Sequence, residues 1–302
     1  MPAYHVPVLL SRVLEAARGA RRVVDATLGD GGHAGAFLAA GAEVLGIDRD
    51  PEAIATARRR LGEERITYLR SPYDAPEALE AARRFRPDFV LLDLGVSSRQ
   101  LDEERRGFTF RPGAPLDMRM GEEAEGAAEV LNRWPEERLR LIFAEYGDER
   151  RAAALAREVT RRRRRAPLAT SDDFVNAIRA ALGPRSGPAD FARLFQAVRI
   201  AVNDELAGLE RALPAFRDAL VPGGTLAVIS YHSGEDRTVK RHFHEWARAC
   251  VCPPGQPVCT CRGRALGRAE PRGAIAPDAA EIAANPRARS AKLRLFRVAD
   301  AA

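Results

Sequence analysis

The chain has 302 residues, 46% hydrophobic and 30% charged, which is enough to bury the core of one large domain or of one and a half. No apolar run reaches the ~20 residues that cross a bilayer, and residues 1–12 lack the basic and apolar pattern of a secretory signal. We therefore expect a soluble cytoplasmic protein without membrane association. The net charge of +6 permits a polyanionic partner such as nucleic acid, but nearly all of the positive charge is arginine, and codon composition would produce that as readily as binding.

The first hundred residues alternate between strand and helix patterns. Four short apolar runs predict buried strands: RRVVDATLG, AEVLGID, ITYLRSPY and PDFVLLDLG. Helices are predicted between them, in HAGAFLAAG, behind the N-cap residue Asp50 and its following Pro51, and around residues 77–85. This alternation predicts a parallel sheet with helices on both faces.

The pattern changes after Gly95. Residues 97–125 mix charge, proline and glycine, and residues 127–182 carry only helix patterns. One long helix is then expected from the apolar spacing between Val198 and Phe216, followed by a strand in GTLAVIS and by KLRLFRV, which can add an antiparallel strand. The sequence thus predicts an α/β core made of residues 1–104 and 196–302, interrupted by an all-helical insertion at 105–195.

A glycine-rich turn follows the first predicted strand. Gly29-x-Gly31-x-x-Ala34 formally fits a dinucleotide fingerprint, with Asp48 placed nineteen residues beyond Gly29 for a ribose. Asp25 and Asp30, however, would repel a pyrophosphate. S-adenosylmethionine has no phosphate, and its sulfonium and ammonium groups suit nearby acids. A methyltransferase is therefore favoured over a nicotinamide-dependent oxidoreductase, which remains the main alternative enzyme.

Several longer motifs then point to one family. These are DATLGDGGHAG, GIDRDPEAI, LLDLGVSSRQLDEERRGFTFRPGAPLDMRM, FQAVRIAVNDEL, ISYHSGEDRTVKRHF and NPRARSAKLR. Together they resemble the bacterial RsmH (MraW) family of 16S ribosomal RNA cytosine-N4 methyltransferases, which act on cytosine 1402. The matches run from His5 in HVPVLL to the last predicted strand, and the block from LDLGVSS to PLDMRM is the most specific.

The resemblance implies a class I, Rossmann-like α/β methyltransferase fold with an inserted helical domain. It implies S-adenosyl-L-methionine as cofactor and 16S rRNA of the small ribosomal subunit as partner, and it leaves a homodimer open. Matching positions imply a set of cofactor contacts: Gly31, Gly32, His33, Asp48, Tyr73, Asp93 and Gln100. Tyr73 stands where relatives often carry phenylalanine, so its place beside the adenine ring is retained.

The residues also bear on the reaction. Methylation at C5 of a pyrimidine needs a cysteine nucleophile, and no cysteine lies near the loop after the fourth strand. Methylation of an exocyclic amine needs only alignment with the sulfonium and suitable acceptors. Asp117, Ser97 and His232 are candidate acceptors, and the sequence does not choose among them. The choice of N4 rests on the resemblance, because Asp93-Leu94-Gly95-Val96 replaces the usual amine-methylating motif.

All four cysteines lie in CVCPPGQPVCTC, as Cys250, Cys252, Cys259 and Cys261. Four thiolates can close a tetrahedral zinc site, but the usual spacing is C-x-x-C. Reduced thiols that hold no metal are therefore the preferred interpretation, and no metal ligand is assigned. Disulfides are not expected in a cytoplasmic chain.

Two further features leave alternatives open. Phe108 and Phe110 can stack on a flipped base, cover the cofactor or form a local loop core. The run Arg161–Arg165 can contact phosphates or form a solvated helix face, and Arg287 and Arg289 pose the same choice. The alternative to an enzyme is a non-catalytic RNA-binding protein that has a nucleoside pocket. An assay of methyl transfer distinguishes the two, because such a protein would bind its RNA without methylating it.

Overall fold

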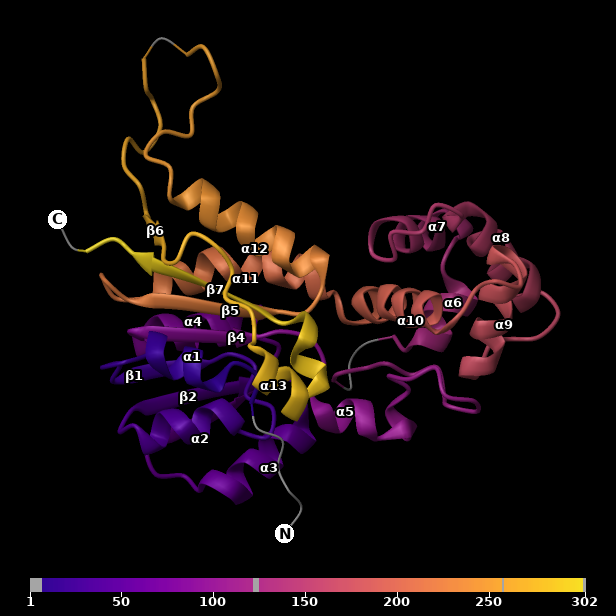
Figure 1. The fold of residues 1–302 in the computed structure, drawn as a ribbon, viewed down its shortest axis with the longest axis horizontal. Coiled ribbons are helices and arrows are strands. Elements are labelled where there is room, and N and C mark those ends of the chain that lie inside the picture. The colour runs from indigo at the N-terminus through magenta and orange to yellow at the C-terminus, as the bar shows by residue number, and fades with distance from the viewer. Residues whose placement is uncertain (1–6, 122–124, 257, 301–302) are drawn as a thin grey trace. The chain divides into compact units, whose positions relative to one another are not determined.

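The computed structural model describes residues 7–121, 125–256 and 258–300, which divide into two compact units (Figure 1). The α/β unit contains the described residues up to Gly95 and from Leu206 onward, and the helical unit is Val96–Glu205. His5, where the family resemblance begins, lies outside the described residues.

Within the described residues, the α/β unit contains one seven-stranded sheet. Its strands are β1 (Arg22–Asp25), β2 (Glu43–Asp48), β3 (Ile66–Arg70), β4 (Phe89–Asp93), β5 (Thr225–Ser230), β6 (Gly267–Ala269) and β7 (Lys292–Val298). The strand order is β3-β2-β1-β4-β5-β7-β6. Strands β1 to β5 pair in parallel, and β7 lies antiparallel between β5 and β6. The predicted parallel sheet with KLRLFRV added as an antiparallel strand is confirmed, whereas the edge strand β6 was not predicted from the sequence.

Alternating strand residues pack against helices on both faces of this sheet. Val24, Val90 and Val228 belong to a core cluster with α4, α11 and α12, whereas Val23 and Leu91 belong to another with α1, α2 and α3. The alternation follows from the two-residue period of a strand. The helical elements near the sheet are α1 (Leu10–Ala16), α2 (Gly32–Ala39), α3 (Pro51–Leu61), α4 (Pro76–Phe85), α11 (Glu205–Ala219), α12 (Ser233–Trp246), α13 (Ala279–Ala284) and η2 (Pro286–Ser290).

The helical unit has its own hydrophobic core, centred on aromatic side chains. Phe143 and Phe174 stack with ring centroids 5.9 Å apart, and Phe195 lies 5.1 Å from Phe174. Its helical elements are α5 (Ser98–Asp102), η1 (Glu104–Arg106), α6 (Ala127–Arg133), α7 (Glu136–Glu145), α8 (Ala152–Arg163), α9 (Ser171–Leu182) and α10 (Pro188–Asn203). Among its described residues the only β-type pairing is an isolated bridge between Pro115 and Thr170.

The prediction of one long helix through residues 198–216 was wrong. Asp204 adopts φ of 52°, in the left-handed region, and separates α10 from α11. Just before it, the Asn203 side chain accepts from Met120 N–H and donates to the Met118 carbonyl. This contact with a distant loop outweighs the continuous apolar spacing. It also explains why the helical unit ends at Glu205, ten residues beyond the predicted boundary.

The N-terminal boundary of the helical unit also differs from the prediction. The unit begins at Val96, nine residues before the predicted insertion at 105, because α5 and η1 group with the helices that follow.

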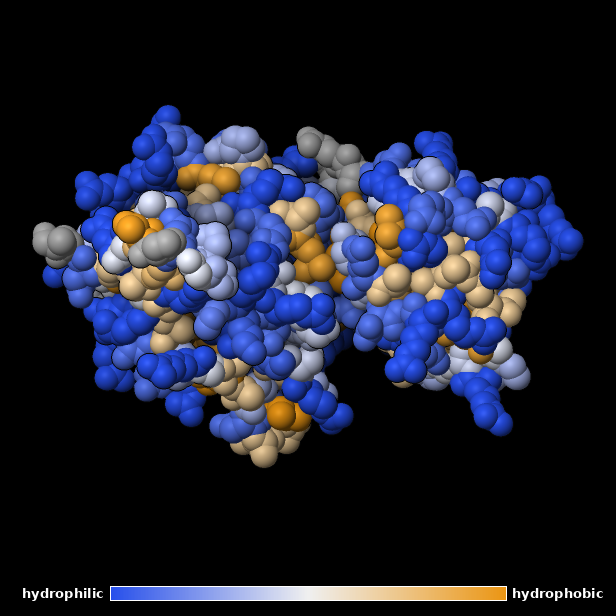
Figure 2. Space-filling model, turned by 90° about the horizontal axis from the view of Figure 1, so that it is seen from above, coloured by the Kyte–Doolittle hydropathy of each residue, from blue (hydrophilic) through white to orange (hydrophobic). Residues whose placement is uncertain are grey.

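No helix in the described ranges combines the length and apolar character needed to cross a membrane. The space-filling view shows a mainly hydrophilic face (Figure 2). Among described residues, Leu141 and Val258 are the exposed large hydrophobic side chains.

Candidate functional site

Parallel pairing brings the carboxyl ends of β1, β2 and β4 to one edge of the sheet. Asp25, Asp48 and Asp93 each end one of these strands, so the three carboxylates that the sequence singled out gather at this edge. Ligands of open α/β sheets bind outside this edge. We call this set of residues, with the turn after β1, the strand-end site.

The glycine turn after β1 forms a tight entry to α2. Gly31 has φ of 79° and caps the helix, and a Cβ there would lie 2.6 Å from Leu61 Cδ1. A Cβ at Gly32 would lie 2.6 Å from Pro7 Cγ. Side chains at either position would therefore displace their neighbours, so this tight turn requires glycine at both positions.

Asp48 anchors this turn from the end of β2. Its carboxylate accepts from Gly29 N–H at 2.7 Å and from Asp50 N–H at 2.8 Å. A carboxylate has about four acceptor positions, so further hydrogen bonds from a ligand are compatible with these two. Burial raises the pKa of Asp48 to about 6, although the two backbone N–H groups counteract this.

Asp25 is the most buried acid of the site, with 1% of its surface exposed. Its Oδ1 accepts a long hydrogen bond of 3.4 Å from Thr27 N–H, and no described group hydrogen-bonds to its Oδ2. Burial raises the pKa of Asp25 to about 6, against the attraction of nearby His33. A buried carboxylate oxygen without a donor indicates that this site is completed by a ligand.

His33 and Asp93 face each other across the strand-end site. His33 is buried at the start of α2, and neither of its ring nitrogens has a hydrogen-bond partner among the described residues. Its Nε2 lies 3.6 Å from Asp93 Oδ2, close enough for an ion pair when the ring is protonated but too long for a good hydrogen bond.

Two residues outside the set of predicted cofactor contacts, Tyr231 and Thr27, hold Asp93 in place. The Tyr231 hydroxyl donates to Asp93 Oδ1 at 2.8 Å, and Asp93 N–H donates to Thr27 Oγ1 at 2.6 Å. Burial, followed by the charge of Asp93, raises the pKa of Tyr231, so the phenol stays protonated and acts as a donor. Tyr231 directly follows β5, so the sequence places it at a strand end, but its contact with Asp93 is visible only in the structure.

The three candidate acceptors already serve local contacts. His232 caps α12 by accepting from Glu235 N–H, and its Nε2 lies 3.2 Å from the Glu235 carboxylate. Ser97 caps α5 by accepting from Gln100 N–H at 3.2 Å. Asp117 accepts a bidentate pair from the Arg119 guanidinium. The structure therefore singles out none of the three as the catalytic acceptor.

The structure groups six of the seven predicted cofactor residues in the α/β unit and places Gln100 in the helical unit. Tyr73 lies in the turn after β3 and packs against the core cluster that contains α4 and α11. Gln100 is buried in α5, where its Oε1 accepts from Ser97 N–H at 2.9 Å and completes a capping box. The cofactor role of Gln100 stays a prediction.

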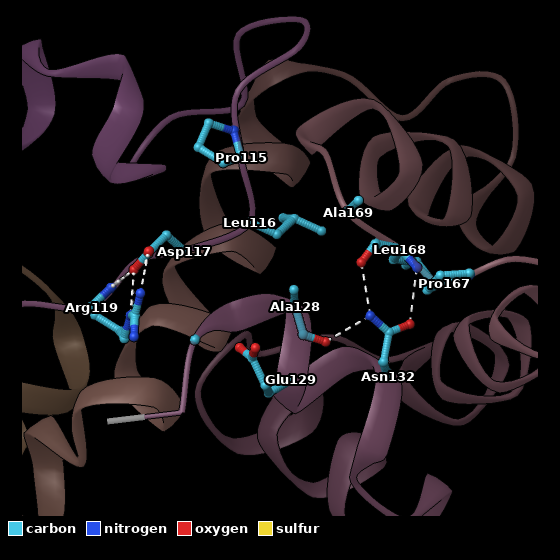
Figure 3. A pocket seen from close by; sticks show the side chains of 11 residues that line it. Pro115, Leu116, Asp117, Arg119, Ala128, Glu129, Asn132, Pro167, Leu168 and Ala169 are labelled. Atoms are coloured by element: carbon cyan, nitrogen blue, oxygen red, sulfur yellow. Dashed lines mark hydrogen bonds and ion pairs between the residues drawn. The ribbon is translucent and has the colours of Figure 1, made fainter. Parts of the chain in front are cut away.

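The helical unit contains a pocket of about 380 Å³, within the size range of small-molecule sites (Figure 3). The Asp117–Arg119 pair lies on one side, and the Asn132 amide on the other bonds to Ala128 and Leu168 (Figure 3). Burial raises the pKa of Asp117, but the Arg119 hydrogen bonds and charge outweigh it, so the pKa is lowered overall. Asp117 is therefore anionic at neutral pH.

The two phenylalanines that the sequence left open pack into the core of the helical unit. Phe110 meets Phe191 and Phe195 edge-on, with ring centroids 6.0 and 6.1 Å away, and Phe108 packs against the same cluster. The structure thus supports the local-core interpretation of Phe108 and Phe110.

The run Arg161–Arg165 divides into three roles. Arg161 and Arg162 pair with Glu158, and Arg163 donates to the carbonyls of Leu131 and Trp134 at the end of α6. Arg164 and Arg165 are exposed. Arg164 and Arg165 can therefore bind an external anion without breaking an ion pair or hydrogen bond of the kind that holds Arg161, Arg162 and Arg163.

These features define a class of protein. A doubly wound sheet whose last strand in the chain, β7, is antiparallel carries a glycine turn flanked by acids, an arrangement that does not suit a pyrophosphate. The fold is that of a class I, Rossmann-like methyltransferase with an inserted helical unit, as expected from the sequence.

Comparison with known proteins identifies the family. The chain belongs to the MraW methylase family, whose model matches residues 2–299. It is 59% identical over 301 residues to "Ribosomal RNA small subunit methyltransferase H" of Gemmatimonas aurantiaca, covering 98% of this chain and 96% of the relative. A protein of the same name from Rubrobacter xylanophilus is 47% identical over 312 residues, covering 99% and 98%. An rRNA methylase from Streptococcus thermophilus aligns with TM-score 0.43 and 12% identity, over 96% and 94%.

Proposed function

We propose that the protein transfers a methyl group from S-adenosylmethionine to the exocyclic N4 amine of cytosine 1402 in 16S rRNA of the small ribosomal subunit. Membership of the MraW methylase family and the names of its relatives support an rRNA methyltransferase. The location of all four cysteines between 250 and 261, away from the strand ends, argues against chemistry at C5.

The observation that carries the cofactor assignment is the buried acidic cluster at the strand-end site. Asp25 and Asp48 lie at the ends of adjacent strands, and burial raises the pKa of each to about 6. Such a cluster is costly without a cation and fits one that carries no phosphate. S-adenosylmethionine supplies an electrophilic methyl group on a sulfonium when it is bound.

The residues of the chain have distinct roles in this proposal. Asp48 binds the ribose hydroxyls, and Gly31 and Gly32 allow the backbone to approach the ligand closely. Asp93, fixed by Tyr231 and Thr27, faces the reacting end of the cofactor with its second oxygen. Because Asp93 is held before the ligand arrives, little reorganisation is needed during the reaction.

The helical unit binds the RNA in this proposal. Arg164 and Arg165 supply exposed positive charge, and the pocket of about 380 Å³ lined by the Asp117–Arg119 pair lies in the same unit. Phosphate contacts position the RNA, whereas contacts to base edges select the nucleotide.

The test is methyl transfer from labelled S-adenosylmethionine to small subunits that lack this modification. Mass spectrometry of nuclease fragments should find one methyl group on N4 of cytosine 1402. The Asp48→Ala variant is the matched control and should transfer much less at the same cofactor concentration. A methyl group at C5 or on another nucleotide would overturn the site assignment. Binding of the small subunit without methyl transfer would indicate a non-catalytic RNA-binding protein. Binding of NAD in place of S-adenosylmethionine would indicate an oxidoreductase.

A further inference from the structure

A long segment between α12 and β6, residues 247–266, contains all four cysteines, and we call it the cysteine loop. Its described residues form no helix or strand, and they project from the sheet in Figure 1. Of these residues, only Leu266 packs against a hydrophobic core cluster. A loop of this length without secondary structure needs another source of order or a function.

The sulfur atoms of the cysteine loop converge on one point. Cys259 Sγ lies 3.4 Å from the Sγ of Cys261, 3.8 Å from that of Cys250 and 3.9 Å from that of Cys252. All four sulfur atoms lie within 4.8 Å of one another. These separations are far longer than the ~2.05 Å of a disulfide, and the four thiols are free.

The separations match those around a single metal ion. A tetrahedral zinc site with Zn–S bonds of about 2.3 Å has its sulfur atoms about 3.8 Å apart. An iron–sulfur cluster would need space for several iron and sulfide atoms between the thiolates, which sulfur atoms this close do not leave. Four thiolates in this arrangement favour zinc among the common divalent metals.

The turn between the two C-x-C pairs is built to keep them together. Gly255 has φ of 84°, and the Gln256 side chain donates to the Val258 carbonyl at 3.0 Å and to Thr260 Oγ1 at 2.8 Å. Val251 N–H donates to Cys261 Sγ at 3.3 Å. Backbone donors to ligand atoms of this kind orient metal-binding side chains.

The base of the loop is closed separately. Leu266 N–H donates to the Trp246 carbonyl at 2.8 Å, and the Arg262 guanidinium donates to the carbonyls of Glu245 and Arg248. The segment is thus fixed at its base by hydrogen bonds, whereas its tip has the cysteine cluster in place of a hydrophobic core.

We propose that Cys250, Cys252, Cys259 and Cys261 bind one zinc ion that holds the tip of the cysteine loop in place. Four protein ligands leave no open coordination position, so the site is structural rather than catalytic. The spacing C-x-C differs from the usual C-x-x-C, which is why the sequence favoured free thiols. The described residues between Cys252 and Cys259 form a turn that brings the two pairs together, and this arrangement is visible only in three dimensions.

The first measurement is elemental analysis of the full-length protein, purified without a polyhistidine tag and without chelator. We expect one zinc per chain. The double variant Cys250→Ser with Cys261→Ser should retain less than a tenth of it. Val258→Ala, which changes an exposed side chain of the same loop, should retain all of it. Circular dichroism and cofactor affinity show whether the double variant is folded.

A second measurement keeps the proposal testable if the double variant fails to fold. Fully reduced wild-type protein, freed of metal, is titrated with Zn²⁺ and separately with Co²⁺. We expect binding of one ion per chain and the absorption bands of tetrahedral cobalt–thiolate coordination. Reduced protein that contains no metal as purified and binds neither ion would overturn the proposal. Two disulfides in protein purified under reducing conditions would do the same.

Discussion

Carboxylates at the strand-end site and in the helical unit are held in opposite electrostatic states. At the strand-end site, burial raises the pKa of Asp25 and of Asp48 to about 6. In the helical unit, hydrogen bonds from Arg161 and Arg162 lower the pKa of Glu158 to about 2, despite some burial. The same functional group is therefore destabilised as an anion at the strand-end site and stabilised at Glu158.

The difference reflects what neutralises each charge. The helical unit pairs its acids internally, with Glu158 on two arginines and Asp117 on Arg119, so these charges need no ligand. At the strand-end site, one buried oxygen of Asp25 has no donor among the residues that the structure describes. A buried anion without a partner costs free energy, and this cost is recovered when a cationic ligand binds. Unneutralised acids thus distinguish the cofactor site from structural ion pairs.

The largest expected effect tests this contrast through pH. The pKa of Asp25 is raised from 3.8 to about 6 in the folded protein, so its contribution to stability is full below about pH 4 and is lost as the pH rises through 6. At 1.36 kcal/mol per pKa unit, Asp25→Asn should raise the free energy of unfolding at pH 8 by about 3 kcal/mol. It should also weaken cofactor binding.

Urea denaturation of both proteins at pH 4 and pH 8 measures this difference. Asp117→Asn is the matched control from the helical unit, because its pKa is lowered. The ionised Asp117 carboxylate stabilises the fold at pH values above its pKa in the unfolded chain, and this stabilisation is lost as the pH falls. Asp117→Asn should therefore lower the free energy of unfolding at pH 8 by about 1 kcal/mol. If both substitutions changed the free energy of unfolding at pH 8 in the same direction, the contrast between the strand-end site and the helical unit would be refuted.

The second prediction concerns cofactor affinity. Asp48→Ala should weaken S-adenosylmethionine binding by about 1.5–3 kcal/mol, because a charged acceptor for ribose hydroxyls is lost. Asp48 also holds Gly29 N–H, so Asp48→Asn, which keeps one carbonyl oxygen, should lose less. Titration calorimetry measures both, with NAD as a ligand that should not bind. Unchanged affinity in both variants would place the ribose elsewhere.

The third prediction concerns the residue that fixes Asp93. Tyr231→Phe removes a 2.8 Å hydrogen bond to a carboxylate and should lower the rate of methyl transfer about tenfold, equivalent to about 1.4 kcal/mol. Cofactor affinity should change much less, since Tyr231 acts through Asp93. Single-turnover rates separate the two effects. A large loss of affinity with an unchanged rate would assign Tyr231 to binding instead.

The smallest expected effect on the folded protein comes from the exposed arginines of the helical unit. Arg164→Gln with Arg165→Gln should leave stability and cofactor affinity unchanged, and should lower the salt slope of subunit binding by about one unit for each lost phosphate contact. Arg163→Gln is the contrast, because it removes two hydrogen bonds to carbonyls and should cost stability. If the double variant retains the wild-type slope, RNA binds elsewhere, and Arg287 and Arg289 become the next candidates.

The sequence by itself determined the features that depend on neighbouring residues. The two-residue and 3.6-residue periods predicted every strand of the sheet except β6 and most helices, the Asp50-Pro51 cap predicted the start of α3, and KLRLFRV predicted the antiparallel strand β7. The glycine turn with its acids favoured a cofactor without phosphates, and the family motifs identified the family. All of these are short-range patterns, which the local chain encodes directly.

Only the tertiary structure decided which of these residues share a site and which groups stay unpaired. The break at Asp204, the hydrogen bond of Tyr231 to Asp93 and the carbonyl contacts of Arg163 each join residues far apart in the chain. The convergence of the four cysteine sulfur atoms likewise depends on a turn that brings two pairs together. Burial and partner choice depend on packing between distant segments, and for that reason composition and spacing could not supply them.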